Sequence, residues 1–207
     1  MTIDYNLIFT NIWSSLQRVL LGGGFAFLVG VLFGLIRYQF PLFLRKNFLF
    51  NFILDAPKFP PPIAWIPFVI LAFGIGLKAS LAIVFIGVFP PVATSTYEAL
   101  YGIKPEIIRT ARSLELSGFK MLRKIYIPAI MPNLFTGARI GLGMGWMSII
   151  AAEMISGDSG LGYSIQLNRL NLRYDLMIID MVCISIVGFF LHYSLVQLEK
   201  RVIKWKA

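Results

Sequence analysis

Long runs without charged residues recur along this sequence and constrain its fold more than any other feature. Residues 19–36, 59–77 and 79–97 contain no Asp, Glu, Lys or Arg. A helix of about 20 apolar residues crosses the hydrocarbon of a bilayer, where backbone groups must be satisfied internally. With 57% apolar residues, we therefore predict an all-α integral membrane protein rather than a soluble domain.

Five membrane spans are predicted from these runs and from two that follow. The expected spans cover residues 19–36, 59–77, 79–97, 133–155 and 181–198, with an amphipathic lead-in over 7–18. Four prolines between Pro60 and Pro67 interrupt the second run, so we expect that span to be broken or to start late, with residues 48–54 as a preceding half. No linker or low-complexity segment is visible, and a single domain over residues 1–207 is expected.

The long charged exception to this pattern is residues 98–132, here called the basic stretch. Pro105 suits a first helical turn, and Ser117-Gly118 interrupts the apolar periodicity, so we predict short helices over 105–116 and 119–125. So many charges cannot lie in lipid. The stretch is expected to be an aqueous loop whose apolar face something else covers. Its six basic residues are Lys104, Arg109, Arg112, Lys120, Arg123 and Lys124.

The placement of lysine and arginine predicts the orientation, because cytoplasmic loops are enriched in both. With the N-terminus outside, thirteen would lie on the inner side and three on the outer side. The inner set is Arg37, Arg45, Lys46, the six of the basic stretch, Lys200, Arg201, Lys204 and Lys206, and the outer set is Lys78, Arg169 and Arg173. We therefore expect a cytoplasmic basic stretch and C-terminus. The same bias accounts for the net charge of +9 without a nucleic-acid partner.

The residue types needed for catalysis or metal binding are scarce. The chain has one histidine, His192, and one cysteine, Cys183, so no metal cluster or nucleophile–histidine pair can be assembled. The phosphate-binding pattern G-x-x-x-x-G-K-[ST] is absent as well. We expect no enzyme activity, metal or cofactor in this chain. Energy for any active process would come from a partner.

The basic stretch resembles the EAA coupling loop of permease subunits in bacterial-type ABC importers. Ile125-Tyr126-Ile127-Pro128 fits the final Ile-x-Leu-Pro of that motif. Counting back nine residues places Glu115 where the family usually has Gly, and Arg109-Thr110-Ala111 where it has Glu-Ala-Ala. Only Ala111 matches the triplet, and these departures bear on the ion pairs of docking.

Further motifs follow in the order that one branch of this family shows. Pro60 to Pro67, Phe73 to Gly76, Ala151 to Ile155 and Ser159 to Tyr163 resemble permeases for nitrate, alkanesulfonates, taurine and related small anions. Importers of thiamine precursors and other organic solutes share these motifs. The resemblance covers nearly the whole chain and implies the type I ABC importer permease fold.

The resemblance also implies partners and a location. It implies a second permease subunit, expected as a homodimer, two cytosolic ATPase subunits that hold ATP and Mg²⁺, and an extracytoplasmic substrate-binding protein. It places the chain in a bacterial-type inner membrane. The residues implied in ATPase coupling are Ile107, Arg109, Ala111, Arg112, Leu114, Glu115, Phe119, Leu122, Arg123, Ile125 and Pro128.

Four residues of the fourth span are candidates for the translocation path or its gate. They are Arg139, Trp146, Ser148 and Glu153. For Glu153 the alternative is a structural hydrogen bond at the outer edge, and for Arg139 it is snorkelling to the headgroups. Two other functions stay open from the residues alone: an ATP-independent channel or secondary carrier with broken helices, and a membrane scaffold whose basic loop binds a regulator.

Overall fold

The computed structural model describes residues 5–41 and 47–204 of the chain. Arg45, Lys46 and Lys206, which the orientation count includes, lie outside the described residues. The described elements are helical: α1 (Tyr5–Gln39), α3 (Phe48–Asp55), η1 (Ala56–Lys58), η2 (Pro62–Trp65), α4 (Ile66–Phe73), α5 (Leu77–Tyr101), α6 (Pro105–Ser113), α7 (Gly118–Met121), η3 (Leu122–Tyr126), α8 (Ile127–Ser156), α9 (Leu161–Leu170) and α10 (Tyr174–Val202).

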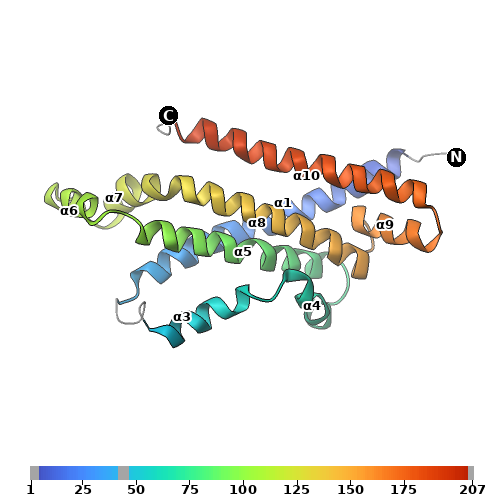
Figure 1. Cartoon of the computed structure of the whole chain (residues 1–207), viewed down its shortest axis with the longest axis horizontal. Helices are drawn as coiled ribbons and strands as arrows, with labels where there is room; N and C mark the ends of the chain where they lie inside the picture. The colour runs from blue at the N-terminus through green and yellow to red at the C-terminus, as the bar shows by residue number, and fades with distance from the viewer. Residues whose placement is uncertain (1–4, 42–46, 205–207) are drawn as a thin grey trace.

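The long helices run side by side along the longest axis of the molecule (Figure 1). The N-terminus lies at one end of this bundle, with α9, and the C-terminus lies at the other end, with α6 and α7. Among the described residues, four helical segments are long and apolar enough to cross a membrane: Tyr5–Gln39, Leu77–Tyr101, Gly118–Ser156 and Tyr174–Val202. They contain the first, third, fourth and fifth expected spans.

The second expected span is broken, as its prolines predict. Two short pieces, η2 and α4, replace a continuous helix there, and α3 and η1 precede them. Proline lacks the amide that an α-helix needs in its interior, so Pro62 and Pro67 occur in the first turns of new helices instead. Gly74 ends α4 with a φ of 73°, a conformation that suits glycine. The apolar piece that remains, Pro62–Phe73, is shorter than a full span.

Helix α5 lies between α1 and α8 and contacts both through glycine. A Cβ added at Gly34 of α1 would lie 2.9 Å from the carbonyl oxygen of Ala93. A Cβ added at Gly141 of α8 would lie 3.0 Å from the carbonyl oxygen of Val88. Glycines recur at four-residue spacing on both partners, at Gly30 and Gly34 of α1 and at Gly137, Gly141 and Gly145 of α8, and this spacing is typical of closely packed helices.

The second helix expected in the basic stretch is not a separate element. Helices α7, η3 and α8 form one continuous helical segment from Gly118 to Ser156. Segment η3 is a π-helical turn, in which the amide of Ile127 donates to the carbonyl of Leu122. Because Pro128 cannot donate to the residue four before it, the wider turn preserves the helix where an α-helical register would lose a bond. The predicted break at Ser117-Gly118 is present, since α6 ends at Ser113 and α7 begins at Gly118, but the helix predicted over 119–125 does not end before the fourth span.

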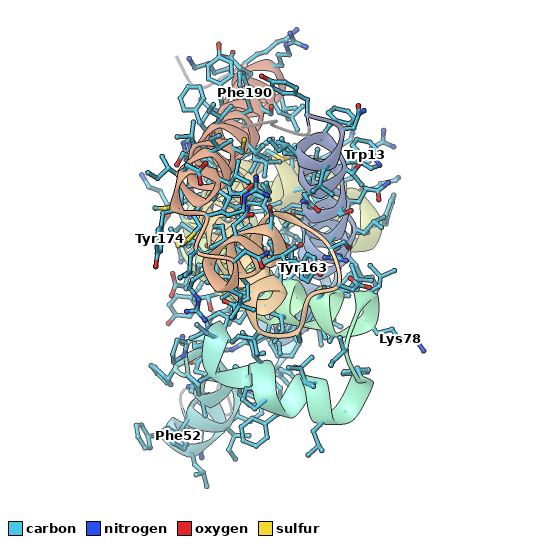
Figure 2. The ribbon with its side chains drawn as sticks, turned by 90° about the vertical axis from the view of Figure 1, so that its right-hand side faces the viewer. Trp13, Phe52, Lys78, Tyr163, Tyr174 and Phe190 are labelled. Carbon is cyan, nitrogen blue, oxygen red and sulfur yellow. The ribbon has the colours of Figure 1, made fainter. Side chains whose placement is uncertain are left out.

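Large apolar side chains cover the outside of the bundle. In the view from the end that carries α9, Trp13 of α1 and Phe190 of α10 point outward, and Phe52 of α3 lies at the opposite edge (Figure 2). Each of these three side chains is more than half exposed. Such a surface is unusual for a soluble monomer and suits contact with lipid or with other membrane subunits.

Candidate functional site

The basic stretch forms a compact projection at the end of the bundle (Figure 1). Helix α6 begins at Pro105, and its one buried residue is Ala111, which is 3% exposed. Ala111, one of the residues implied in ATPase coupling, therefore packs inside its own chain and does not present its side chain on the surface of the projection. The apolar side chains that do face outward are Ile107, Leu114 and Phe119, at 46%, 70% and 74% exposure.

Glu115 ends α6 in a conformation that explains the glycine expected at this position. Its φ is 56°, in the left-handed region. The Leu116 amide donates to the Ala111 carbonyl at 3.0 Å, and the Glu115 amide donates to the Arg112 carbonyl at 2.9 Å. This pair of bonds is the Schellman ending, whose C′ residue is usually glycine because a Cβ disfavours left-handed backbone. A residue with a Cβ therefore occupies a turn conformation that glycine adopts more readily.

The basic side chains of this projection form an unneutralised surface. All six are exposed, and none has an ion-pair partner within the described residues. Leu122, Ile125 and Pro128 are half-buried along the helix that leads into the membrane. A hollow of about 890 Å³ lies between this projection and the end of α1, and Arg112, Glu115, Phe119 and Leu122 contribute to its lining. The residues implied in ATPase coupling therefore all lie at one end of the molecule. Ala111 is the one among them whose side chain is buried.

Glu153 lies at the opposite end of the bundle in a buried polar network. Its carboxylate, 1% exposed, accepts hydrogen bonds from the Arg18 guanidinium at 2.9 Å, the Ser15 hydroxyl at 2.8 Å and the Gly162 amide at 3.0 Å. Arg18 is itself 6% exposed, so this ion pair is shielded from water. The contacts favour the structural alternative for Glu153 over a pore-lining role.

The same network caps helix α9. The amides of Gly160 and Leu161 donate to Asn11 at 3.1 Å and Ser15 at 2.9 Å, so side chains of α1 hold the first turn. The Arg18 guanidinium also donates a hydrogen bond, at 2.9 Å, to the carboxylate of Asp158 in the loop between α8 and α9. Burial would raise the pKa of the Asp158 carboxyl, but the Ser159 hydroxyl, a backbone amide and Arg18 together hold this pKa below its usual value. These contacts tie α1, α8 and α9 into one unit, called the α9 clasp below.

The other path candidates are also engaged within the chain. Arg139 pairs with Glu199 of α10 at 2.9 Å. The indole of Trp146 is 8% exposed and donates to the Ile184 carbonyl at 3.3 Å, and the Ser148 hydroxyl donates to the Met144 carbonyl at 2.6 Å. Arg139 and Trp146 therefore link α8 to α10, whereas Ser148 bonds to the backbone of α8 itself. None of them lines the cleft of about 390 Å³ that lies between α5, α8 and the segment from η1 to η2.

Sequence reasoning passed over three charged residues that make polar contacts within the chain, namely Arg18, Lys58 and Asp180. Arg18 and Lys58 belong to neither set of the orientation count, and that exclusion was the available signal for a role within the membrane. Asp180, 2% exposed in α10, accepts hydrogen bonds from Ser164 and Asn168 of α9, both at 2.8 Å. In the residues searched, no group of three His, Cys, Asp or Glu could hold a metal ion.

Comparison with known proteins shows the family. The profile of the family described as "Binding-protein-dependent transport system inner membrane component" matches residues 25–204. The chain belongs to this family. The permease is 30% identical to the taurine transport system permease protein of Escherichia coli strain K12, over 96% of this chain and 71% of that protein. It is 29% identical to the nitrate import permease protein of Leptolyngbya laminosa, over 95% and 69% of the two chains.

A solved structure confirms the fold. An inward-facing form of the MetNI methionine ABC transporter matches with a TM-score of 0.79 and 22% identity, over 98% of this chain and 99% of that chain. The resemblance of the basic stretch to the loop of ABC importer permeases is thereby confirmed at the level of family and fold. The chain is an inner-membrane permease component of an ABC transport system, and the channel, carrier and scaffold alternatives are not favoured.

Proposed function

We propose that this permease assembles as a homodimer with two cytosolic ATPase subunits, which bind the basic stretch. The observation that supports this most is the projection at one end of the bundle. It combines exposed Leu114 and Phe119 with six basic side chains that have no ion-pair partner in the described chain. An apolar contact surrounded by unpaired cations fits a protein groove with an acidic rim. ATP and Mg²⁺ would be held by those partner subunits.

The continuous helix beyond the projection suggests how motion would pass into the membrane. Because α7, η3 and α8 form one helical segment, a displacement at Phe119 moves α8 without an intervening loop. Close glycine contacts at Gly137, Gly141 and Gly145 seat α8 on α5. The α9 clasp fixes the far end. We expect closure of the ATPase pair to move α8 and α5 together and to alternate access to the path.

The cargo we propose is a small anion or small organic solute delivered by an extracytoplasmic binding protein. The proteins named for taurine and for nitrate transport support this class. The N-terminus would lie outside and the basic stretch in the cytoplasm. At the described ends of the bundle, Arg37, Lys200 and Arg201 lie in last turns at the basic end, as a cytoplasmic surface requires.

The test is co-expression of the full chain with a Walker-motif ATPase and a secreted binding protein encoded in the same genome. We expect the ATPase to co-purify, and we expect proteoliposomes to take up a small sulfonate or nitrate only with ATP and the binding protein. Uptake that persists without ATP would contradict the proposal. Purification of the chain without any ATPase, under conditions that preserve the dimer, would contradict it as well.

A further inference from the structure

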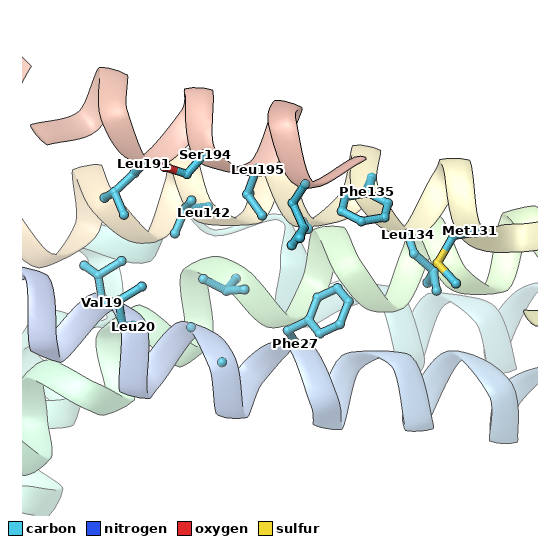
Figure 3. A pocket seen from close by; sticks show the side chains of 15 residues that line it. Val19, Leu20, Phe27, Met131, Leu134, Phe135, Leu142, Leu191, Ser194 and Leu195 are labelled. Carbon is cyan, nitrogen blue, oxygen red and sulfur yellow. The ribbon is translucent and has the colours of Figure 1, made fainter. Parts of the chain in front are cut away.

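Helix α10 borders two hollows that share no lining residue and differ in chemistry. The hollow of about 600 Å³ that it forms with α1 and α8 is apolar (Figure 3). The one hydroxyl in this lining belongs to Ser194 and donates to the Phe190 carbonyl at 2.7 Å. The apolar hollow therefore offers no binding group to a charged ligand.

The second hollow, here called the cationic cleft, has a volume of about 610 Å³ and lies between α8 and the end of α10. Three cations from two helical segments line it: Arg139 on α8, Lys200 in the last turn of α10, and Lys204 just after α10. The rest of the lining consists of Val196, Glu199 and Ile203. One small volume thus combines basic and apolar side chains.

One of the three cations is neutralised within the chain. The Arg139 guanidinium pairs with the Glu199 carboxylate at 2.9 Å, and their side chains are 29% and 12% exposed. Lys200 and Lys204 are exposed, and neither has an ion-pair partner among the described residues. Three cations and one carboxylate leave the cleft with a net charge of +2. This excess charge is complementary to an anion.

The Arg139–Glu199 pair places the cleft at the boundary between hydrocarbon and water. Residues 140–152 of α8 and 181–198 of α10 contain no Asp, Glu, Lys or Arg, so each apolar run ends directly beside the paired residue. Because the pair joins the two helices, both runs end at one level. Long cationic side chains at such a level extend to the lipid headgroups.

The cleft is distant from the surface proposed for the ATPase contact. Lys124, the last cation of the basic stretch, lies on the same continuous helical segment as Arg139. About 15 residues separate them, which is about 22 Å along a helix. A subunit seated on the projection meets surface in water, whereas the cleft lies level with the headgroups. The level therefore favours a lipid over a protein as the ligand.

An acyl chain finds an apolar path beside the same cleft. Gly143 follows Arg139 by about one helical turn, and a Cβ added there would meet no atom within 4 Å. On α10, Phe189 precedes Val196 by about two turns and is 62% exposed. Residues spaced in this way lie on one face of a helix. The surface that continues from the cleft toward the membrane centre is therefore apolar and uncovered by the described chain.

We propose that the cationic cleft binds an anionic phospholipid from the leaflet at the basic end of the bundle. Lys200 and Lys204 bind the phosphate of the headgroup. Arg139, held in place by Glu199 and Thr136, keeps further N–H donors for the same phosphate. Basic pockets between membrane helices at the cytoplasmic surface are typical sites for anionic headgroups. The inference goes beyond the proposed function, because it assigns a lipid ligand and not a cargo.

The experiment identifies the lipid beside the cleft in the full chain, reconstituted in phosphatidylcholine bilayers with Cys183 replaced by alanine. A bimane fluorophore is attached to Val196→Cys in the cationic cleft or to Leu198→Cys in the apolar hollow. The quencher is phosphatidylglycerol or phosphatidylcholine with a nitroxide near the carboxyl end of one acyl chain. At Val196→Cys we expect half-maximal quenching at about 25-fold less labelled phosphatidylglycerol, since each lysine contributes about fivefold. At Leu198→Cys the two lipids are expected to agree within about twofold, because no unpaired cation lines that hollow.

Variants of the lysines identify the binding groups. The double variant Lys200→Gln with Lys204→Gln is expected to remove the preference for phosphatidylglycerol at Val196→Cys. Arg201→Gln is the matched control, since it lies in the last turn of α10 but outside the cleft, and it is expected to keep the preference within about twofold. An unchanged quenching curve at Leu198→Cys in each variant reports an intact fold.

Several results would overturn the inference. Equal quenching by the two lipids at Val196→Cys would remove the site, and an equal preference at both probes would show only general attraction to a basic surface. Absence of quenching by either lipid would show that a second subunit covers this face. Release of the labelled lipid by excess glycerol 1-phosphate, which has no acyl chain, would reveal a site for soluble phosphates instead. The measurement needs neither ATP nor cargo, so its failure leaves the proposed function standing.

Discussion

Glu115 adopts a backbone conformation that costs a residue with a Cβ about 1–2 kcal/mol relative to the right-handed region. Glycine avoids this cost but loses more chain entropy on folding. We therefore predict that Glu115→Gly stabilises the end of α6 by about 1 kcal/mol and slows hydrogen exchange of the Leu116 amide about fivefold. Glu115→Ala is the control, because it removes the charge and keeps the Cβ. Equal slowing in the two variants would show that charge, and not backbone strain, limits this turn.

The Arg18–Glu153 pair lies where water cannot compensate a lost partner. Its side chains are 7% and 0% exposed, and removing one member of a buried pair typically costs about 3–5 kcal/mol. We predict a loss of about 3 kcal/mol in the free energy of unfolding for Arg18→Met, measured by denaturant titration in detergent. Asp158→Asn is the matched control on the same guanidinium. Its side chain is 65% exposed, so a change below about 1 kcal/mol is expected. Similar losses in both variants would contradict the prediction that the buried Arg18–Glu153 contact contributes more to the free energy of unfolding than the exposed Arg18–Asp158 contact.

At the scale of elements, uncharged runs predict where long helices lie but not how those helices continue beyond the runs. The fourth run begins at residue 133, yet its helix begins at Gly118, because a π-turn accommodates Pro128. Periodicity could not show this, since Ser117-Gly118 and the prolines each resemble a helix boundary. The broken second span was predictable because four prolines leave no uninterrupted helical register. The inward turn of Ala111 depends on tertiary packing, which residue types alone do not reveal.

The continuous helix and the exposed apolar residues of the basic stretch lead to a prediction about coupling. A carboxylate at Leu114 or Phe119 cannot enter an apolar groove without desolvation, and both side chains are exposed in the free chain. We predict that Leu114→Asp and Phe119→Asp reduce ATP-dependent uptake at least tenfold, with normal expression and membrane insertion. Lys120→Gln, a neighbouring exposed change, is expected to stay within about twofold, because a single surface charge contributes little. Wild-type uptake by both Asp variants would exclude these residues from the ATPase contact.

At the scale of the whole molecule, the lysine and arginine residues form three groups: the inner set, the outer set and three residues that belong to neither. The described members of the inner set lie at the end of the bundle that carries α6 and the C-terminus. The outer set lies at the opposite end, with Lys78 at the start of α5 and Arg169 and Arg173 around the end of α9. Arg18, Lys58 and Arg139 belong to neither set, and in the structure each has a carboxylate partner within the chain. Composition could identify these three as exceptions. Their partners depend on helices distant in sequence, so only the fold could assign them.

The orientation itself is testable with two thiols at opposite ends of the bundle. In a Cys183→Ala background, Ser113→Cys lies at the last residue of α6 and Asn171→Cys follows α9, and both positions are exposed. With basic residues on the cytoplasmic side, a membrane-impermeant maleimide is expected to label Asn171→Cys in intact spheroplasts and Ser113→Cys only after lysis. Labelling after lysis confirms that each thiol is reactive. The reverse pattern would place the basic stretch outside the cell, where no ATP-hydrolysing partner could reach it, and the coupling role would fail with the orientation.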